Sequence, residues 1–148
     1  MSENPSLSPS AVRASREVRA VISRLRRRIL NAAEVEDITL GQASVLARLS
    51  DKAGVTASEL ASADGVRHQS MTATVASLAA RGLVERGPDP DDGRRLLITL
   101  TAEGQRRVDE GRQARTEWLA GQLQDRCTEE ERRAVIASMA VLERLTHD

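Results

Sequence analysis

The stretch Gly87–Gly93 constrains the fold of this chain most, because it forces a sharp reversal in a sequence that is otherwise rich in helix-forming residues. It consists only of glycine, proline and aspartate, which strongly favour turns. Two short segments with apolar residues flank it, Leu83–Arg86 and Arg95–Leu100. They are predicted to be antiparallel strands, joined by a tight hairpin turn at Asp92-Gly93.

Three capping boxes predict where helices begin in the rest of the chain. In such a box a hydroxyl side chain is followed three residues later by glutamate or glutamine, and each satisfies a backbone N–H of the first helical turn. Thr39, Thr56 and Thr128 each start this pattern. The helices are expected over residues 11–33, 40–51, 57–63, 67–81, 102–124 and 129–146.

This order of elements predicts a mainly α fold of the winged helix-turn-helix class, in which two short helices precede a two-stranded hairpin, the wing. Residues 1–10 are rich in serine and proline and are expected to be disordered. Residues 11–148 are expected to form a single domain, with a DNA-binding lobe at residues 39–100. Trp118 is the only aromatic residue, so the core must be aliphatic.

The last expected helix carries apolar side chains on most of its sides, which argues for a partner chain. A helix with one apolar stripe is buried by its own domain, whereas one that is apolar nearly all round needs further contacts. The residues concerned are Val135, Ile136, Met139, Val141, Leu142 and Leu145. The pattern therefore favours a dimer.

The net charge of the chain predicts only modest electrostatic affinity for nucleic acid. Lysine and arginine together number 22, as do aspartate and glutamate, so the formal charge is zero. Domains that bind nucleic acid usually carry a basic excess. Arginines are nevertheless concentrated in residues 1–34, and a neutral total with a basic helix does not exclude DNA binding.

Several classes of protein are disfavoured by what the sequence lacks. Cys127 is the only cysteine, which excludes an intrachain disulfide, and no apolar run approaches the roughly 18 residues of a membrane span. The chain starts without an apolar signal core, so a cytoplasmic location without membrane contact is expected. It has no phosphate-binding loop, nucleophile–base pair or metal-ligand spacing, and His68 and His147 are isolated. We therefore expect no enzyme, no cofactor and no metal site.

The expected helix 67–81 has one apolar face for the core and one face suited to DNA. The second face is made of small and hydroxyl-bearing side chains, and no acidic residue occurs between Gly65 and Leu83 to repel phosphate. The candidates for DNA contact are Arg67, His68, Gln69, Ser70, Thr72 and Ala73. The alternative is an ordinary surface helix rich in small residues.

These side chains match different parts of a DNA groove. Gln69 is suited to an adenine edge, Ser70 and Thr72 are suited to phosphate, and alanine methyls are suited to thymine methyls. Few strong base-reading side chains are present, so much of the specificity is expected to come from DNA shape.

The wing supplies two further DNA-binding candidates, Arg94 and Arg95. Asp92 and Arg94 flank Gly93, so their side chains are expected to reach each other and stiffen the tip. A stiff tip would aim an arginine into a narrow minor groove, where the negative potential is strongest. A solvated polar hairpin without a DNA role is the alternative.

Motifs along the middle of the chain resemble those of the MarR family of bacterial transcriptional regulators. They are Gln69-Ser70-Met71-Thr72, Gly82-Leu83-Val84, Asp89–Arg95 and Leu100-Thr101-Ala102-Glu103-Gly104. The helix order matches this family over nearly the whole chain. The aspartate–arginine wing followed by the Leu-Thr-x-x-Gly helix start is the most specific of these signals.

The resemblance implies an obligate homodimer in which helices from residues 11–34 and 102–146 interleave. It also implies that the recognition helix occupies a major groove of double-stranded DNA and the wing the adjacent minor groove. Arg94 matches the family's wing arginine and Asp92 its tethering partner. Such proteins typically repress a neighbouring gene or their own operon and release a pseudo-palindromic operator when a small phenolic or anionic compound binds.

The sequence indicates the effector site only weakly. Arg16 and Arg19 are candidates for an anion contact, and Trp118 for an aromatic contact, although an anchor in the dimer core is the favoured role of Trp118. Oxidant-sensing relatives use a cysteine near the start of the first helix, where this chain has none, and Cys127 is interpreted as a packing residue.

Two other functions compete with a ligand-controlled repressor. The chain is alternatively a winged-helix module that docks a protein, which an acidic or neutral recognition face would favour. A DNA-binding protein that responds to no effector is the other alternative.

Overall fold

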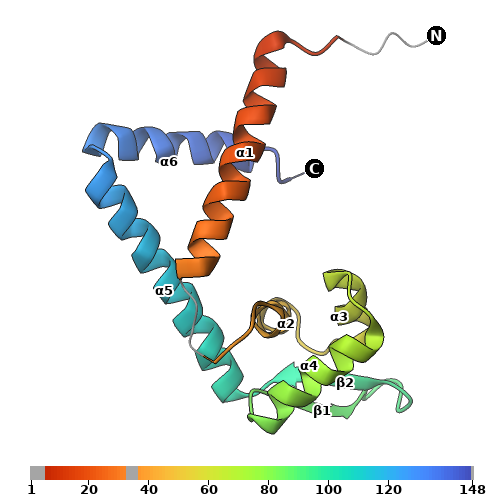
Figure 1. Cartoon of the computed structure of the whole chain (residues 1–148). Helices are drawn as coiled ribbons and strands as arrows, with labels where there is room; N and C mark the ends of the chain where they lie inside the picture. The colour runs from red at the N-terminus through yellow and green to blue at the C-terminus, as the bar shows by residue number, and fades with distance from the viewer. Residues whose placement is uncertain (1–5, 33–36, 148) are drawn as a thin grey trace, which may run out of the picture. The chain divides into compact units, whose positions relative to one another are not determined.

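The computed structural model describes residues 6–32 and 37–147, which form six helices and one hairpin (Figure 1). In chain order these are α1 (Pro9–Ala32), α2 (Leu40–Asp51), α3 (Ala57–Asp64), α4 (His68–Ala80), β1 (Val84–Pro88), β2 (Leu96–Leu100), α5 (Ala102–Arg126) and α6 (Glu129–Glu143). The predicted order of a mainly α winged helix-turn-helix is confirmed. The two strands pair antiparallel, with Val84 opposite Leu100 and Pro88 opposite Leu96.

The first helix begins earlier than the sequence predicts. Ala11 was its expected first residue, but the helix starts at Pro9 because the Ser8 hydroxyl accepts a hydrogen bond from the Ala11 N–H at 3.2 Å. Proline is favoured at the first helical position, where its missing N–H costs nothing. Of the segment expected to be disordered, residues 1–5 lie outside the described residues.

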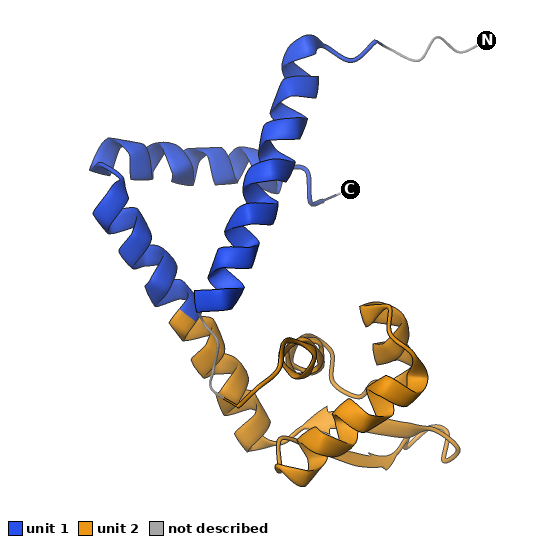
Figure 2. Ribbon diagram, viewed as in Figure 1, with its two compact units in different colours: residues 1–33, 115–148 blue, residues 34–114 orange. Residues whose placement is uncertain are grey.

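The chain is divided into two compact units (Figure 2). One comprises residues 34–114, and the other comprises residues 1–33 and 115–148. The boundary falls inside α5, so the unit of residues 34–114, called the lobe below, contains the predicted lobe 39–100 and the start of α5. The reason is packing: Gly104 and Val108 of α5 are buried in the lobe.

The core of the lobe is aliphatic, as predicted from the near absence of aromatic residues. Met71, Val75 and Leu78 form the buried face of α4. They pack with a larger set of buried residues from every other element of the lobe, namely Val45, Leu46, Leu49, Val55, Leu60, Ala61, Leu83, Val84, Ile98 and Val108. The three predicted capping boxes also form, and each gives the start of its helix a fixed position.

A bridge that the sequence did not predict joins the hairpin to the segment before α3. The Val55 N–H donates to the Ile98 carbonyl at 3.3 Å, and the Ile98 N–H donates to the Val55 carbonyl at 2.8 Å. Gly54, with φ of +71°, turns the chain after α2 so that Val55 can lie beside β2. The base of the wing is thereby attached to the start of α3.

The turn at the tip of the hairpin differs from the prediction. A tight Asp92-Gly93 turn needs left-handed backbone, yet Gly93 is not among the described glycines with positive φ. The connection is a longer loop instead, closed by hydrogen bonds from the Asp89 N–H to the Arg95 carbonyl (2.9 Å) and from the Arg95 N–H to the Asp92 carbonyl (3.0 Å). Asp92 stabilises this loop with its own side chain, because its Oδ1 accepts from the Arg94 N–H at 3.1 Å.

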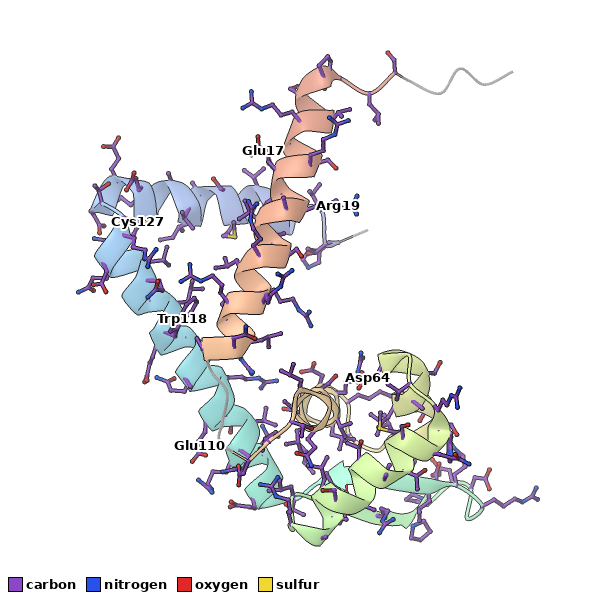
Figure 3. All side chains as sticks on the ribbon, in the orientation of Figure 1. Glu17, Arg19, Asp64, Glu110, Trp118 and Cys127 are labelled. Atoms are coloured by element: carbon purple, nitrogen blue, oxygen red, sulfur yellow. The ribbon has the colours of Figure 1, made fainter. Side chains whose placement is uncertain are left out.

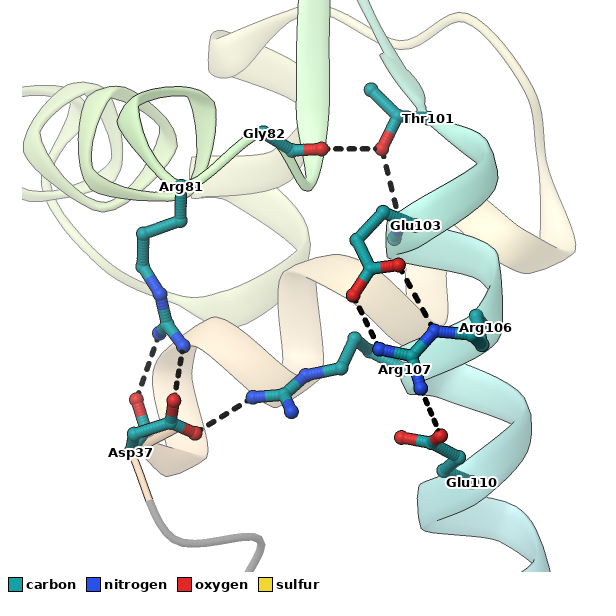
Figure 4. Close-up of polar contacts among 9 residues, drawn as sticks. Asp37, Arg81, Gly82, Thr101, Glu103, Arg106, Arg107 and Glu110 are labelled. Carbon is teal, nitrogen blue, oxygen red and sulfur yellow. Dashed lines mark hydrogen bonds and ion pairs between the residues drawn. The ribbon is translucent and has the colours of Figure 1, made fainter.

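The hairpin joins α5 through a close backbone contact around Thr101 and Gly104 (Figure 4). The Thr101 hydroxyl donates to the Gly82 carbonyl at 2.6 Å and accepts from the Gly104 N–H at 3.0 Å. A Cβ atom on Gly104 would lie 2.0 Å from the Leu83 carbonyl oxygen. The Leu-Thr-x-x-Gly motif therefore has a packing reason, since only glycine permits this approach of α5 to the chain after α4.

A cluster of charges holds three distant parts of the lobe together (Figure 4). Arg81, at the end of α4, contacts both the carbonyl and the carboxylate of Asp37 at 2.8 Å, and Arg107 of α5 contacts the same carboxylate at 2.7 Å. Asp37 has φ of +83°, a strained value for a residue other than glycine. The ion pairs offset this strain and fix the end of α4 against α5.

The other unit has no buried side chain among its described residues. Its large apolar residues are exposed instead, including Ile136, which is 70% exposed, and Leu145, which is 79% exposed. The Arg28 guanidinium lies 5.5 Å from the centre of the Trp118 ring, a cation–π contact within this unit. None of the helices in the described ranges has the length and apolar character of a membrane span.

Candidate nucleic-acid interface

The exposed face of α4 lies where the sequence placed it. Arg67 is the N-cap residue rather than the first helical residue, and the helix begins at His68. All six candidates of this segment are exposed: Arg67, His68, Gln69, Ser70, Thr72 and Ala73. The Thr72 hydroxyl donates to the His68 carbonyl at 2.9 Å, so it can accept a further bond but must turn to donate to a phosphate.

Polar contacts at two places, the turn before α4 and the end of α4, fix this helix in the lobe. At the turn before it, Asp64 accepts from the Ser44 hydroxyl at 3.0 Å and pairs with Arg48, while Gly65 takes the left-handed conformation. Near its end, the Gln42 side-chain amide donates to the Ser77 hydroxyl at 3.1 Å. The exposed face is therefore presented by a helix anchored at both ends.

Gln42 was identified from the sequence only as a member of a capping box. Its Oε1 does accept from the Thr39 N–H at 3.0 Å, and its Nε2 is then free to reach Ser77. A glutamate, as found in the other two boxes, has no donor for this second bond. Glutamine in place of glutamate in this capping box is the sequence feature that could have indicated the Gln42–Ser77 hydrogen bond.

Two arginines of the wing have no side-chain partner among the described residues, Arg94 in the loop and Arg86 in β1. Arg94 is exposed, and within the described residues its guanidinium makes no ion pair. The expected pairing of its side chain with Asp92 is wrong, because Asp92 binds the Arg94 backbone N–H instead. The tip is still stiffened by Asp92, and the Arg94 guanidinium stays available for a ligand.

Arg95 is held differently, between two carboxylates. Its guanidinium lies 3.6 Å from Asp89 of the wing and 3.6 Å from Glu59 of α3. Asp89 also accepts from the Asp91 N–H at 2.9 Å, so it supports the loop in two ways. Acidic residues in a DNA-binding wing would repel phosphate, and these contacts show that Asp89 and Asp92 serve the loop.

A groove of about 420 Å³ separates α3 and α4 from the hairpin. Three arginines line it, Arg86, Arg94 and Arg95, together with His68, Thr56, Ser58 and Thr72. The groove is thus basic and rich in donors, which suits an anion. Glu59 lies next to it, and the hydrogen bond from the Thr56 backbone lowers the pKa of this carboxyl below its usual 4.5.

The structure does not gather the three effector candidates at one place (Figure 3). Trp118 contacts Arg28, whereas Arg16 and Arg19 are exposed on earlier turns of α1. At 1.5 Å of rise per residue, Arg19 lies about 13 Å and Arg16 about 18 Å along the helix from Arg28. Arg16 and Arg19 line only shallow grooves on the surface of α1.

Comparison with known proteins decides the family. An HTH-type transcriptional regulator of Mycobacterium tuberculosis is 36% identical over 114 residues, which are 77% of this chain and 80% of that protein. The sequence profile of the MarR family matches residues 36–95. The chain belongs to the MarR family. It is accordingly a DNA-binding transcriptional regulator and not an enzyme.

Solved structures agree with this MarR assignment over nearly the whole chain. A putative transcriptional regulator of Pseudomonas aeruginosa is 29% identical, with a TM-score of 0.78 over 96% of this chain and 99% of that one. A mutant of S. aureus MepR, solved bound to an oligodeoxyribonucleotide, shares the fold at 22% identity, with a TM-score of 0.65 over 90% of this chain and 98% of that one. The MarR fold thus includes α1, α5 and α6 as well as the winged lobe.

Proposed function

We propose that this MarR-family protein is a homodimeric, cytoplasmic repressor that holds a pseudo-palindromic operator and releases it when a small anionic or aromatic ligand binds. The observation that carries the proposal is the pairing of an exposed α4 face without acidic residues and a wing that presents Arg94 without a partner. Two-fold symmetry would place two such faces about one helical turn, or 34 Å, apart along the DNA.

The lack of a core in the α1 and α6 unit supports the dimer. Apolar side chains that stay in water do not stabilise the fold, whereas burying a large one stabilises it by about 1.5–3 kcal/mol. Ile22 of α1 and Ile136 and Met139 of α6 are all at least half exposed in the single chain. A second copy would bury these faces and complete the unit.

Replacing Ile136 with glutamate is expected to dissociate the dimer. The carboxylate would be buried without a partner at the contact between copies, at a cost of several kcal/mol for each copy. Sedimentation velocity at micromolar concentration should then find mainly monomer, and operator affinity should fall at least 100-fold.

The matched control introduces the same charge on the polar side of α6. Ala137 is exposed and lies about 100° around the helix from Ile136, in the sector that carries Arg133 and Arg144. Ala137→Glu should remain dimeric. A dimeric Ile136→Glu protein, or a monomeric wild type, would contradict the proposed assembly.

We place the effector in the arginine-lined groove rather than beside Arg16 and Arg19. An anion seated there would neutralise the Arg94 guanidinium, on which DNA affinity depends, and would occupy the space between α4 and the wing. The volume of about 420 Å³ suits a molecule of one aromatic ring with an acidic group. The three arginines also disfavour the protein-docking alternative, which calls for an acidic or neutral face.

Benzoate is a suitable probe for this groove. Calorimetric titration without DNA should detect binding to the wild type, and Arg86→Ala should weaken it about tenfold, because a charge-assisted hydrogen bond is lost. Benzyl alcohol, which has the ring but no charge, should bind neither protein. Equal binding of benzoate by the wild type and Arg86→Ala would contradict this location, and operator release by no tested anion would favour a regulator without an effector.

A further inference from the structure

The loop of the wing is closed around Arg95. Its carbonyl accepts from the Asp89 N–H and its N–H donates to the Asp92 carbonyl, so both backbone groups hold the loop together. Its side chain reaches back to Asp89, whose side chain is only 12% exposed, and outward to Glu59 of α3. Near its tip, the wing is therefore connected to α3 through Arg95.

Glu59 is a fixed anchor for this contact. Its Oε2 accepts from the Thr56 N–H at 2.8 Å and from the Thr56 hydroxyl at 3.2 Å, so the capping box of α3 immobilises the carboxylate. The same oxygen lies 3.6 Å from the Arg95 guanidinium. The residue that ends the capping box of α3 thus also presents a negative charge to the wing.

The wing is attached to the start of α3 at two separate points. The first is the Val55–Ile98 bridge at its base, and the second is the Glu59–Arg95 pair near its tip. Arg95 and Ile98 are three residues apart, about 10 Å along a strand. Two attachments at this separation determine the direction of the hairpin, whereas the bridge alone would let it pivot.

We propose that Glu59 is a positioning residue for DNA binding, which acts through Arg95 to set the direction in which the wing presents Arg94. Arg95 then supports the wing and does not itself contact DNA. Two neighbouring carboxylates already balance its charge, and a phosphate would have to compete with both of them. This inference rests on the proposed entry of the wing into a DNA groove.

The two roles of Arg95 predict opposite effects of removing Glu59. If Arg95 binds phosphate, Glu59 competes for it, and the loss of this carboxylate strengthens DNA binding. If Glu59 positions the wing, its loss weakens DNA binding, even though the net charge of the protein becomes more positive. The sign of the change therefore distinguishes a positioning role from a competing one.

Glu59→Gln tests the proposal without removing the helix cap. Glutamine serves in a capping box as glutamate does, and Gln42 does so in α2. The probe is a 30-base-pair duplex recovered by the wild-type protein from a random library, and its affinity is measured by fluorescence anisotropy at several salt concentrations. We expect binding to weaken about 2- to 10-fold, from an exposed ion pair in each of two wings, with an unchanged salt slope.

Glu131→Gln is the matched control, because Glu131 is the equivalent member of the α6 capping box. It changes the charge equally and should leave the affinity unchanged. In the Glu59→Gln background, Arg95→Ala should cost less affinity than it costs alone, and it should leave the salt slope unchanged.

The inference would be overturned if Glu59→Gln bound the duplex as tightly as the wild type or more tightly. It would also be overturned if Arg95→Ala lowered the salt slope by about one for each arginine removed. Amide exchange at residues 89–95 should be faster in Glu59→Gln than in Glu131→Gln, and equal rates would also count against it. If the wild type recovers no duplex from the library, the proposed DNA-binding function fails together with the role of Glu59. If it does recover a duplex, the variants test the role of Glu59 alone.

Discussion

Gly104→Ala is expected to lower the Tm by about 10 °C or more. The added Cβ would lie 2.0 Å from the Leu83 carbonyl oxygen and 2.9 Å from the Leu100 side chain, both far inside contact distance. The Leu83 carbonyl cannot move away freely, because it accepts from the Thr101 N–H at 3.2 Å. Overpacking of this kind costs about 1–3 kcal/mol, and a clash with backbone belongs at the upper end.

Gly41→Ala is the control for this substitution. Gly41 is also helical, and its nearest neighbour for a new Cβ is the Thr39 hydroxyl at 3.9 Å, an ordinary contact. Alanine favours helix over glycine, so the Tm should stay the same or rise. Thermal unfolding followed by circular dichroism compares the two variants. A Gly104→Ala protein that melts within 2 °C of the wild type would show that α5 does not approach the chain after α4 as closely as described.

Arg94→Ala should weaken operator binding about 30- to 1,000-fold. The Arg94 guanidinium has no partner within residues 6–32 and 37–147, so its interaction with a narrow groove breaks no contact described there. A specific arginine contact contributes about 1–3 kcal/mol; at the lower 1–2 kcal/mol for an exposed wing, the two contacts of a dimer total about 2–4 kcal/mol. The salt slope of the affinity should also fall by about one per wing.

Arg133→Ala provides the matched loss of charge away from the lobe. Arg133 is on α6, and its side chain is 77% exposed. Its removal should change operator affinity less than twofold. If Arg94→Ala bound as tightly as Arg133→Ala, the wing would not contribute to DNA binding and the recognition helix alone would carry it.

Local features of the fold could be predicted well from the sequence. Each capping box depends on residues only three positions apart, and all three formed. The buried face of α4 followed from its helical periodicity. The candidate DNA-contact residues of α4 are exposed because the opposite side of the same helix is apolar.

Contacts between distant residues could not be predicted. The Val55–Ile98 bridge depends on how the hairpin folds back, and the Asp37 cluster joins residues 44 and 70 positions apart. The tight turn at Asp92-Gly93 was wrong because the Asp92 side chain satisfies the Arg94 N–H in a wider loop. The partners of the bridge and of the Asp37 cluster lie far apart in the sequence, whereas in the loop a local hydrogen bond of Asp92 replaced the predicted turn.

In the candidate site, too, residue types could be predicted from the sequence but contacts with distant residues could not. Arg94 and Arg95 are adjacent and chemically identical in the sequence, so both were predicted to bind DNA. The structure separates them, because only Arg95 has carboxylates within reach, and one of these belongs to α3. Residue type was therefore sufficient to find the wing but not to divide the roles within it.

A footprint tests most directly whether two copies of α4, and of the wing that carries Arg94, bind the same DNA duplex. The wild type and Arg94→Ala are compared on the selected duplex by hydroxyl-radical cleavage, with both proteins at concentrations that saturate it. We predict symmetric protection of two half-sites about one helical turn apart, flanked by minor-groove protection that only Arg94→Ala loses. A single asymmetric footprint, or flanking protection that survives in Arg94→Ala, would contradict the account.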